Sequence, residues 1–263
     1  MNIKQKIKKG ECVYGTWCLI PSPEVINVIA QSGLDFVFID MEHGSVNDYT
    51  NVGRMIMASQ VEGCSAIVRV PKLQEDYMLK ALDLFPNGIV VPHIETSSQA
   101  YHFVRYSKYH PKGDRGYSPF TRSGGYNFKQ NYTVDENERL LNIAIVESFD
   151  GLDNLIEICS VPDIDVIYIG VYDISVSLGI PGQVKDKKVL DILEECCKII
   201  KESGKAIGCM YHDKAEHDYL KSIGVTMFAY SVDTSILYEG YKDVKHLKTK
   251  EIEIKIDKLD ILL

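Results

Sequence analysis

The chain of 263 residues lacks several features that would assign it to well-defined classes of protein. It has no apolar run near the roughly 18 residues needed to cross a membrane, and no apolar segment follows its basic start to form a secretion signal. Its net charge of −8 provides no basic surface for nucleic acid. These absences predict a cytoplasmic protein with neither a membrane nor a nucleic acid as its partner.

The cysteines disfavour a cysteine-bound metal site and a disulfide-linked protein, and the sequence shows no linker between domains. The seven cysteines have no metal-type spacing, so we expect buried, reduced thiols. The chain has no internal repeat, low-complexity tract or linker rich in Pro, Gly and Ser. With 45% hydrophobic residues, its length fits one large domain or two small ones.

The sequence does contain a regular alternation of short apolar runs and helical segments. The runs are rich in Val, Ile, Phe and Tyr and mostly continuous, which is typical of strands covered on both faces in a parallel sheet. The first helical segment has Ser22 as its expected N-cap and Gly33 just past its end. The apolar runs lie at residues 14–20, 36–40, 66–70, 88–94, 142–148, 165–173, 205–211 and 227–233.

Eight strand–helix units in about 240 residues predict an α/β fold, a single (β/α)8 TIM barrel. The main rival is an open doubly wound sheet, which usually carries a Gly-rich turn after its first strand, but here only "PSPE" follows. We expect one domain over residues 1–263. A long loop at about 111–141 and a C-terminal arm at about 247–263 depart from the alternation, and the arm is expected to pack on a partner subunit.

Charged residues follow several of the predicted strands, where a barrel places its active site. The second run leads into Asp40, Glu42 and His43, the fifth into Glu147 and the sixth into Asp173. Glu147 and Asp173 come from neighbouring strands, and two carboxylates suit a hard divalent cation such as Mg²⁺ or Mn²⁺. Helix N-capping is the alternative interpretation.

Arg69 and His43 are the other candidates for chemistry at this rim. Arg69, near the end of the third run, can fork onto a carboxylate or an enolate oxygen, or else pair structurally with Glu42 or Asp40. His43 is the natural proton carrier, with Asp40 orienting it, and a purely structural histidine is the alternative.

The lysines disfavour a Schiff-base aldolase, which needs a lysine inside the barrel near a strand end. Lys72 is a loop residue after the third run, and Lys205 begins the seventh run. The carboxylates therefore favour a metal over Schiff-base chemistry.

Several segments together resemble the HpcH/HpaI aldolase family, the metal-dependent pyruvate aldolases typified by 4-hydroxy-2-oxoheptanedioate aldolase. Their D-x-E-H, G-x-R-G and I-G-x-x-D-[IL]-S motifs are specific in combination. The segments include "GLDFVFIDMEHGSVND", "YHPKGDRGYSPFTRSGGY", "IAIVES" and "IYIGVYDISVSLGIPGQ".

The resemblance implies a class II aldehyde-lyase. Such an enzyme reversibly cleaves a 4-hydroxy-2-oxo acid to pyruvate, or a similar 2-oxo acid, and an aldehyde through a metal-stabilised enolate. The resemblance implies that His43 is the catalytic base, supported by Asp40, and that Arg69 stabilises the enolate. It also implies that Glu147 and Asp173 bind the metal, which would be Mg²⁺, Mn²⁺ or Co²⁺.

The resemblance also bears on substrate binding and assembly. It implies that Arg69 and the backbone amides around Tyr172 and Asp173 hold the 2-oxo acid. Family members are usually hexamers, built as trimers of dimers that exchange their last helix. From its place in the long loop, we expect the region of Arg122 and Tyr126 to select the aldehyde.

The sequence departs from the family pattern at several positions. Ile145 replaces a glutamine, Val171 and Tyr172 replace a proline and an alanine, and Phe85 stands where a glycine is common. These departures favour an altered 2-oxo acid or aldehyde partner. Two alternatives stay open, namely a citrate-lyase-like carbon–carbon lyase acting on an acyl-CoA and a non-catalytic protein that binds a 2-oxo acid.

Overall fold

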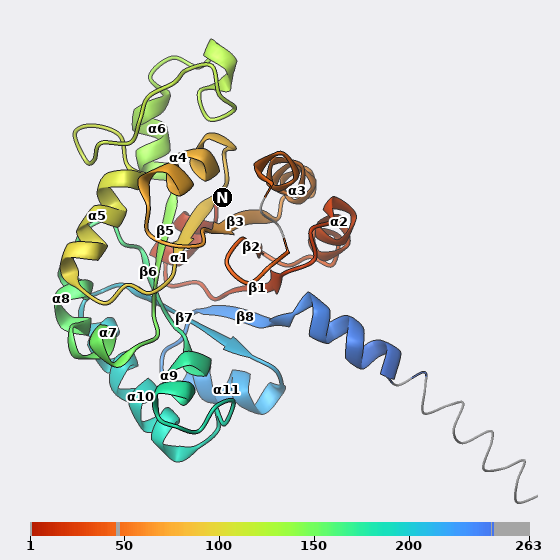
Figure 1. Ribbon diagram of the computed structural model, residues 1–263, viewed down its shortest axis with the longest axis vertical. Coiled ribbons are helices and arrows are strands. Elements are labelled where there is room, and N and C mark those ends of the chain that lie inside the picture. Colours follow the sequence, from red (N-terminus) through yellow and green to blue (C-terminus); the bar gives the residue numbers. More distant parts are fainter. Residues whose placement is uncertain (1, 46–47, 243, 245–263) are drawn as a thin grey trace, which may run out of the picture.

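The computed structural model describes residues 2–45, 48–242 and 244. The expected C-terminal arm at 247–263 lies outside them, so one domain over residues 1–263 stays a prediction. Eight parallel strands follow one another in chain order round a closed barrel (Figure 1), which confirms the predicted TIM barrel. The strands are β1 (Val13–Cys18), β2 (Phe36–Asp40), β3 (Ser65–Arg69), β4 (Gly88–Val91), β5 (Leu141–Val146), β6 (Val166–Ile169), β7 (Ala206–Tyr211) and β8 (Met227–Val232).

Helices surround the barrel, and α2 (Pro23–Gln31) begins where the sequence predicts, because the Ser22 hydroxyl accepts a hydrogen bond from the Val25 N–H. A further helix, at 233–242, follows β8. The others are α1 (Ile3–Lys8), α3 (Tyr49–Val61), α4 (Glu75–Asp83), α5 (Ser97–Ser107), η1 (Gly125–Asn127), α6 (Tyr132–Arg139), α7 (Phe149–Asp153), α8 (Leu155–Ser160), α9 (Val171–Ser177), α10 (Lys187–Glu202) and α11 (Lys214–Ser222). No helix among the described residues is long and apolar enough to cross a membrane.

Two apolar layers hold the barrel together, one between the strands and the helices and one inside the barrel. The inner layer includes Trp17, Phe38 and Tyr168, whose rings pack against one another with centroids 4.2 to 5.8 Å apart. Gly208 makes room for the Tyr168 ring, because a Cβ at that position would lie 2.5 Å from it. The large aromatic side chains thus fill the barrel beneath its mouth.

The long segment at 111–141 connects α5 to β5. Segments that connect a helix to the next strand of a TIM barrel lie at the N-terminal ends of the strands, opposite the usual active site. Accordingly, Arg122 donates hydrogen bonds to the Leu84 carbonyl and to Gln60 Oε1, near the start of β4. The chain direction, and not the length of the loop, decides on which face it lies.

Two buried lysines lie where α5 and β5 approach each other. Lys108 is fully buried and donates hydrogen bonds to the carbonyls of Asn137 and Leu140. Lys4 also donates to Leu140 and pairs with Asp165 at 2.9 Å. Burial, together with the charge of Lys4, lowers the pKa of Lys108 to about 7.

We expect Lys108→Met to reduce the pH dependence of stability. The unfolded chain binds a proton at Lys108 that the folded chain releases above pH 7, so the wild-type free energy of unfolding should rise with pH. The difference between wild type and Lys108→Met should change by about 2 kcal/mol between pH 7 and 9. Urea unfolding across this range measures it, with Lys198→Met, exposed on α10, as the control. A difference independent of pH would contradict the lowered pKa.

Candidate active site

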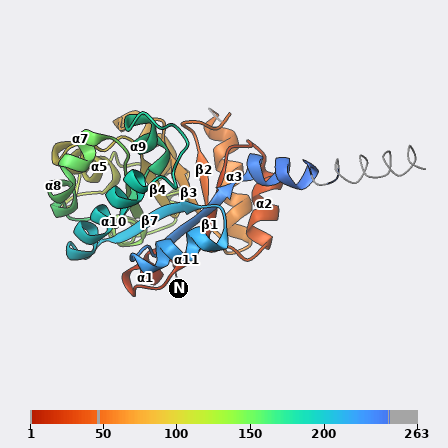
Figure 2. The same cartoon turned by 90° about the horizontal axis from the view of Figure 1, so that it is seen from below.

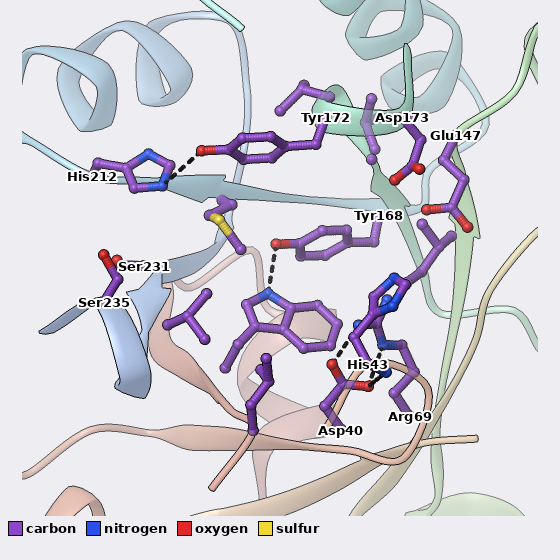
Figure 3. Close-up of a pocket in the computed structure, with 18 residues that line it drawn as sticks. Asp40, His43, Arg69, Glu147, Tyr168, Tyr172, Asp173, His212, Ser231 and Ser235 are labelled. Atoms are coloured by element: carbon purple, nitrogen blue, oxygen red, sulfur yellow. Dashed lines mark hydrogen bonds and ion pairs between the residues drawn. The ribbon is translucent and has the colours of Figure 1, made fainter. Parts of the chain in front are cut away.

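A cavity of about 450 Å³ opens at the C-terminal ends of the strands. Its polar side chains gather at two ends, and aromatic and apolar side chains lie between them (Figure 3). The cavity is lined by Trp17, Leu19, Asp40, His43, Arg69, Ile145, Glu147, Tyr168, Ile169, Gly170, Val171, Tyr172, Asp173, Met210, His212, Ser231, Val232 and Ser235. Six of the seven residues predicted for the site are therefore brought together.

The end of β2 folds into a tight turn around the carboxylate of Asp40. Asp40 Oδ1 accepts hydrogen bonds from the backbone N–H groups of Glu42 at 2.9 Å and His43 at 3.2 Å. Gly44 is required for this turn, since a Cβ there would lie 2.1 Å from the Asp40 carbonyl oxygen. Asp40 thus fixes the main chain of His43, whose exposed side chain lines the cavity.

Arg69 is held in place on three sides. Its Nε and Nη2 donate hydrogen bonds of 2.8 and 2.5 Å to the two oxygens of the fully buried Asp40. Its Nη1 lies 2.8 Å from Glu42 Oε2, and its guanidinium lies 4.5 Å from the centre of the Trp17 ring. A guanidinium has five N–H groups, so the contacts with Asp40 and Glu42 engage three of them and leave two.

The charges around Arg69 keep it ionised. Burial alone would lower the pKa of Arg69, but its hydrogen bonds to Asp40 and the charges of Asp40, Glu42 and Glu147 outweigh it and raise the pKa. The structure thus shows Arg69 as a structural partner of Asp40 and Glu42 and places it in the cavity lining, while its contact with an enolate oxygen stays a prediction.

Glu147 and Asp173 reach the cavity in different ways. Glu147 follows β5, as predicted, and is buried. The sixth predicted strand was too long: β6 ends at Ile169, and Asp173 lies in the first turn of α9. Gly170 ends the strand and lets α9 approach Glu147, because a Cβ there would lie 2.8 Å from Glu147 Oε2. The two carboxyl groups lie side by side in Figure 3.

This carboxylate pair suits a hard cation. Burial raises the pKa of Glu147, and the charges of Asp173 and Glu42 raise it further, against the opposing N–H of His93. That N–H occupies Oε1 of Glu147, at 2.9 Å, and leaves Oε2 on the side of Gly170. No group of three or more His, Cys, Asp or Glu within 2–45, 48–242 and 244 could hold a metal, so water or substrate would complete the coordination.

His93 is a residue of this site that the sequence prediction missed. Its Nε2 lies 3.2 Å from Glu42 Oε1, and its Nδ1 lies 3.1 Å from Glu147 Oε1, so the ring bridges the two carboxylates. Its backbone has φ of 53°. The signal was present, because His93 lies near the end of the fourth apolar run, two residues after β4 ends, and His43 likewise lies just after the second run.

Three other residues named from the sequence lie away from the cavity. Arg122 is bound to Leu84 and Gln60 on the opposite face, so it does not line the cavity of its own barrel, where the sequence prediction had placed it. Lys205 donates to the carbonyls of Val161 and Ile164. Lys72 lies over the Tyr77 ring. Among the described residues, no lysine lines this cavity.

Comparison with known proteins assigns the chain to a family. Residues 14–239 match the family described as "HpcH/HpaI aldolase/citrate lyase". The chain belongs to this family. The resemblance given by the sequence motifs is therefore confirmed.

Individual HpcH/HpaI proteins are similar over nearly the whole chain. A hydroxypyruvate/pyruvate aldolase from Roseobacter denitrificans is 30% identical, over 92% of this chain and 95% of that protein. A 4-hydroxy-2-oxovalerate aldolase from Novosphingobium aromaticivorans is 28% identical, over 92% of each. The crystal structure of a family member from Burkholderia cenocepacia J2315 has a TM-score of 0.89 and 27% identity, over 94% of this chain and 98% of that one.

Proposed function

We propose that the protein is a metal-dependent aldolase, an aldehyde-lyase that reversibly cleaves a 4-hydroxy-2-oxo acid to pyruvate, or a similar 2-oxo acid, and an aldehyde. The observation that carries the proposal is the arrangement at one end of the cavity, where the cation of Arg69 and the carboxylates of Glu147 and Asp173 lie close to His43 (Figure 3). The aldolase names of the relatives agree with it.

Glu147 and Asp173 would hold the divalent cation, for which Mg²⁺, Mn²⁺ and Co²⁺ are the candidates. The bound cation would supply Lewis-acid stabilisation of the negative charge that develops on the 2-oxo acid. Glu147 contributes a buried carboxylate, whose Oε2 lies close to Gly170 at the start of α9.

Two groups of the chain would bind the 2-oxo acid, one at its keto oxygen and one at its carboxylate. The two free N–H donors of Arg69 would bind the keto oxygen and stabilise the enolate as it forms. The backbone N–H groups around Tyr172 and Asp173, in the first turn of α9, would hold the carboxylate of the 2-oxo acid.

We assign the proton transfer to His43. Its imidazole would take the proton of the 4-hydroxyl group while the C3–C4 bond breaks, the electron pair of that bond passes into the enolate and the aldehyde leaves. Protonation of the enolate at C3 then gives pyruvate. Asp40 acts indirectly, because it holds both Arg69 and the main chain of His43.

Exchange of pyruvate protons tests the proposal without knowledge of the aldehyde. The metal-free protein is incubated with pyruvate in D₂O, Mg²⁺, Mn²⁺ or Co²⁺ is added in turn, and the methyl signal is followed by NMR. Loss of the signal that depends on the metal and on the protein supports enolate formation. Binding of pyruvate without exchange under any of the three cations would favour the non-catalytic alternative.

We further propose a homo-oligomer, a hexamer built as a trimer of dimers. The helix at 233–242 extends away from the barrel in both views (Figures 1 and 2). It exposes Ile236, Leu237, Tyr238 and Tyr241, which a partner subunit would cover. Light scattering coupled to size-exclusion chromatography measures the mass in solution, and a monomer at micromolar concentration would contradict the proposal.

A further inference from the structure

The end of the cavity away from Arg69 contains a chain of hydrogen bonds that the proposed chemistry does not use. The hydroxyl of Tyr172 lies 3.1 Å from His212 Nε2, and His212 Nδ1 lies 3.1 Å from Glu216 Oε2. Lys185 lies 2.8 Å from the other oxygen of Glu216. Tyr172 and His212 line the cavity, and Glu216 and Lys185 lie behind them. This series of hydrogen bonds therefore runs from the cavity wall outward to the surface.

Glu216 determines which way these hydrogen bonds point. Burial would raise the pKa of Glu216, but the hydrogen bonds from Lys185 and His212 outweigh it and lower the pKa. The ionised carboxylate only accepts hydrogen bonds, so Nδ1 of His212 carries a proton and donates a hydrogen bond to Glu216. When the imidazole is neutral, Nε2 is the acceptor, and the Tyr172 hydroxyl donates to it.

This direction fixes what Tyr172 offers to a ligand. Its only proton is used by His212, so its oxygen presents lone pairs and accepts a hydrogen bond. A tyrosine phenol is neutral near pH 7, because the ordinary pKa of tyrosine is about 10. A neutral acceptor favours a hydroxyl group over a carboxylate or a carbonyl, since neither of those has a proton to donate.

The Tyr172 hydroxyl lies where it would contact the aldehyde, the second reactant. In Figure 3 the hydroxyl of Tyr172 points away from Asp173 and Glu147, toward His212. Trp17, Tyr168 and Met210 also line the cavity, and in Figure 3 the Tyr168 ring lies between its two ends. A 2-oxo acid bound at Arg69 would thus extend its aldehyde-derived carbons over this apolar surface toward Tyr172.

We propose that Tyr172, His212 and Glu216 form a hydroxyl-binding subsite, which selects aldehydes that carry a hydroxyl group. Tyr172 would bind the hydroxyl through its side chain, and His212 and Glu216 are positioning residues. The inference rests on the proposed aldolase function and names the class of its second reactant.

The test is the ratio of kcat/KM for glycolaldehyde to kcat/KM for acetaldehyde, each with pyruvate and the activating cation. The two aldehydes have equal carbon number and differ in one hydroxyl group. Tyr172→Phe should lower the ratio by about three- to tenfold, because one neutral hydrogen bond is lost. The change should appear in KM for glycolaldehyde, with KM for pyruvate much less affected. A ratio within twofold of wild type overturns the proposal.

Two further variants keep the test decisive. Glu216→Gln, behind the cavity wall, removes the charge that orients His212 and should lower the same ratio; it decides the outcome if Tyr172→Phe is inactive with both aldehydes. Tyr230→Phe is the matched control, because Tyr230 is half-exposed on β8 and does not line this cavity. Its ratio should equal that of wild type.

The outcomes separate the subsite from the aldolase function itself. Failure of wild type to exchange pyruvate protons and to form a product with either aldehyde would overturn the function and, with it, the subsite. Exchange and product formation by wild type, together with ratios that neither variant changes, would overturn the subsite alone.

Discussion

Glu147→Gln is expected to reduce the metal-dependent exchange of pyruvate methyl protons by at least about 100-fold, because changes even in the residues behind metal ligands cost 10- to 100-fold. Glutamine keeps the shape of the side chain, and its carbonyl oxygen can still accept the hydrogen bond from His93 N–H. What is lost is the negative charge beside Asp173. NMR in D₂O measures the exchange, and calorimetric titration with Mn²⁺ measures the affinity for the cation.

Glu95→Gln is the matched control for this substitution. Glu95 lies two residues after His93 and accepts a hydrogen bond from the Ser148 hydroxyl, next to Glu147 in the chain, but it does not line the cavity. Its exchange rate should stay close to that of wild type. Exchange by Glu147→Gln within threefold of wild type would remove Glu147 from the metal site.

Glu147→Gln should not destabilise the metal-free protein, although it should slow the exchange. Folding raises the pKa of Glu147, so its ionised form destabilises the folded protein. The free energy of unfolding therefore falls as the pH rises from the pKa of the unfolded chain to that of the folded chain. At neutral pH, Glu147→Gln removes that cost and the repulsion from Asp173 and Glu42. Metal-free Glu147→Gln should therefore be at least as stable as wild type, which separates loss of the cation from unfolding.

Much of the fold could be predicted because a parallel barrel buries both faces of every strand. All eight strands appear in the sequence as apolar runs, and the charged residues that follow them lie at one rim. The end of the sixth strand was misplaced because "IYIGVYD" stays apolar past Gly170, where the strand gives way to α9. Apolar character alone does not separate a buried strand from the buried start of a helix.

A site residue could be predicted where its position is set by the strand that it follows. It could not be predicted where its contacts depend on several strands. Arg69 and Glu147 follow from strand position. The bridge of His93 between Glu42 and Glu147 depends on three strands at once. Arg122 was misplaced because the length of a loop suggests a function, whereas the helix-to-strand direction of the chain places this loop on the opposite face.

Arg69→Met is expected to slow exchange strongly and also to destabilise the protein. It removes the donors that would stabilise the enolate, which should cost about 100- to 1,000-fold in exchange per folded molecule. It also leaves Asp40, which is fully buried, without its cation. Loss of one partner of a buried ion pair costs about 3–5 kcal/mol. Urea unfolding gives the folded fraction, and exchange rates are then expressed per folded molecule.

Arg115→Met separates the two effects, because Arg115, in the segment between α5 and β5, is also a buried arginine with an ion pair and a ring contact, but it does not line the cavity. Its buried guanidinium lies 4.5 Å from the centre of the Tyr109 ring and pairs with Asp83 at 3.3 Å. Both variants should therefore lose stability, whereas only Arg69→Met should lose exchange per folded molecule. If Arg69→Met keeps more than a tenth of the wild-type rate after this correction, Arg69 is a structural cation only, and the enolate must be stabilised without it.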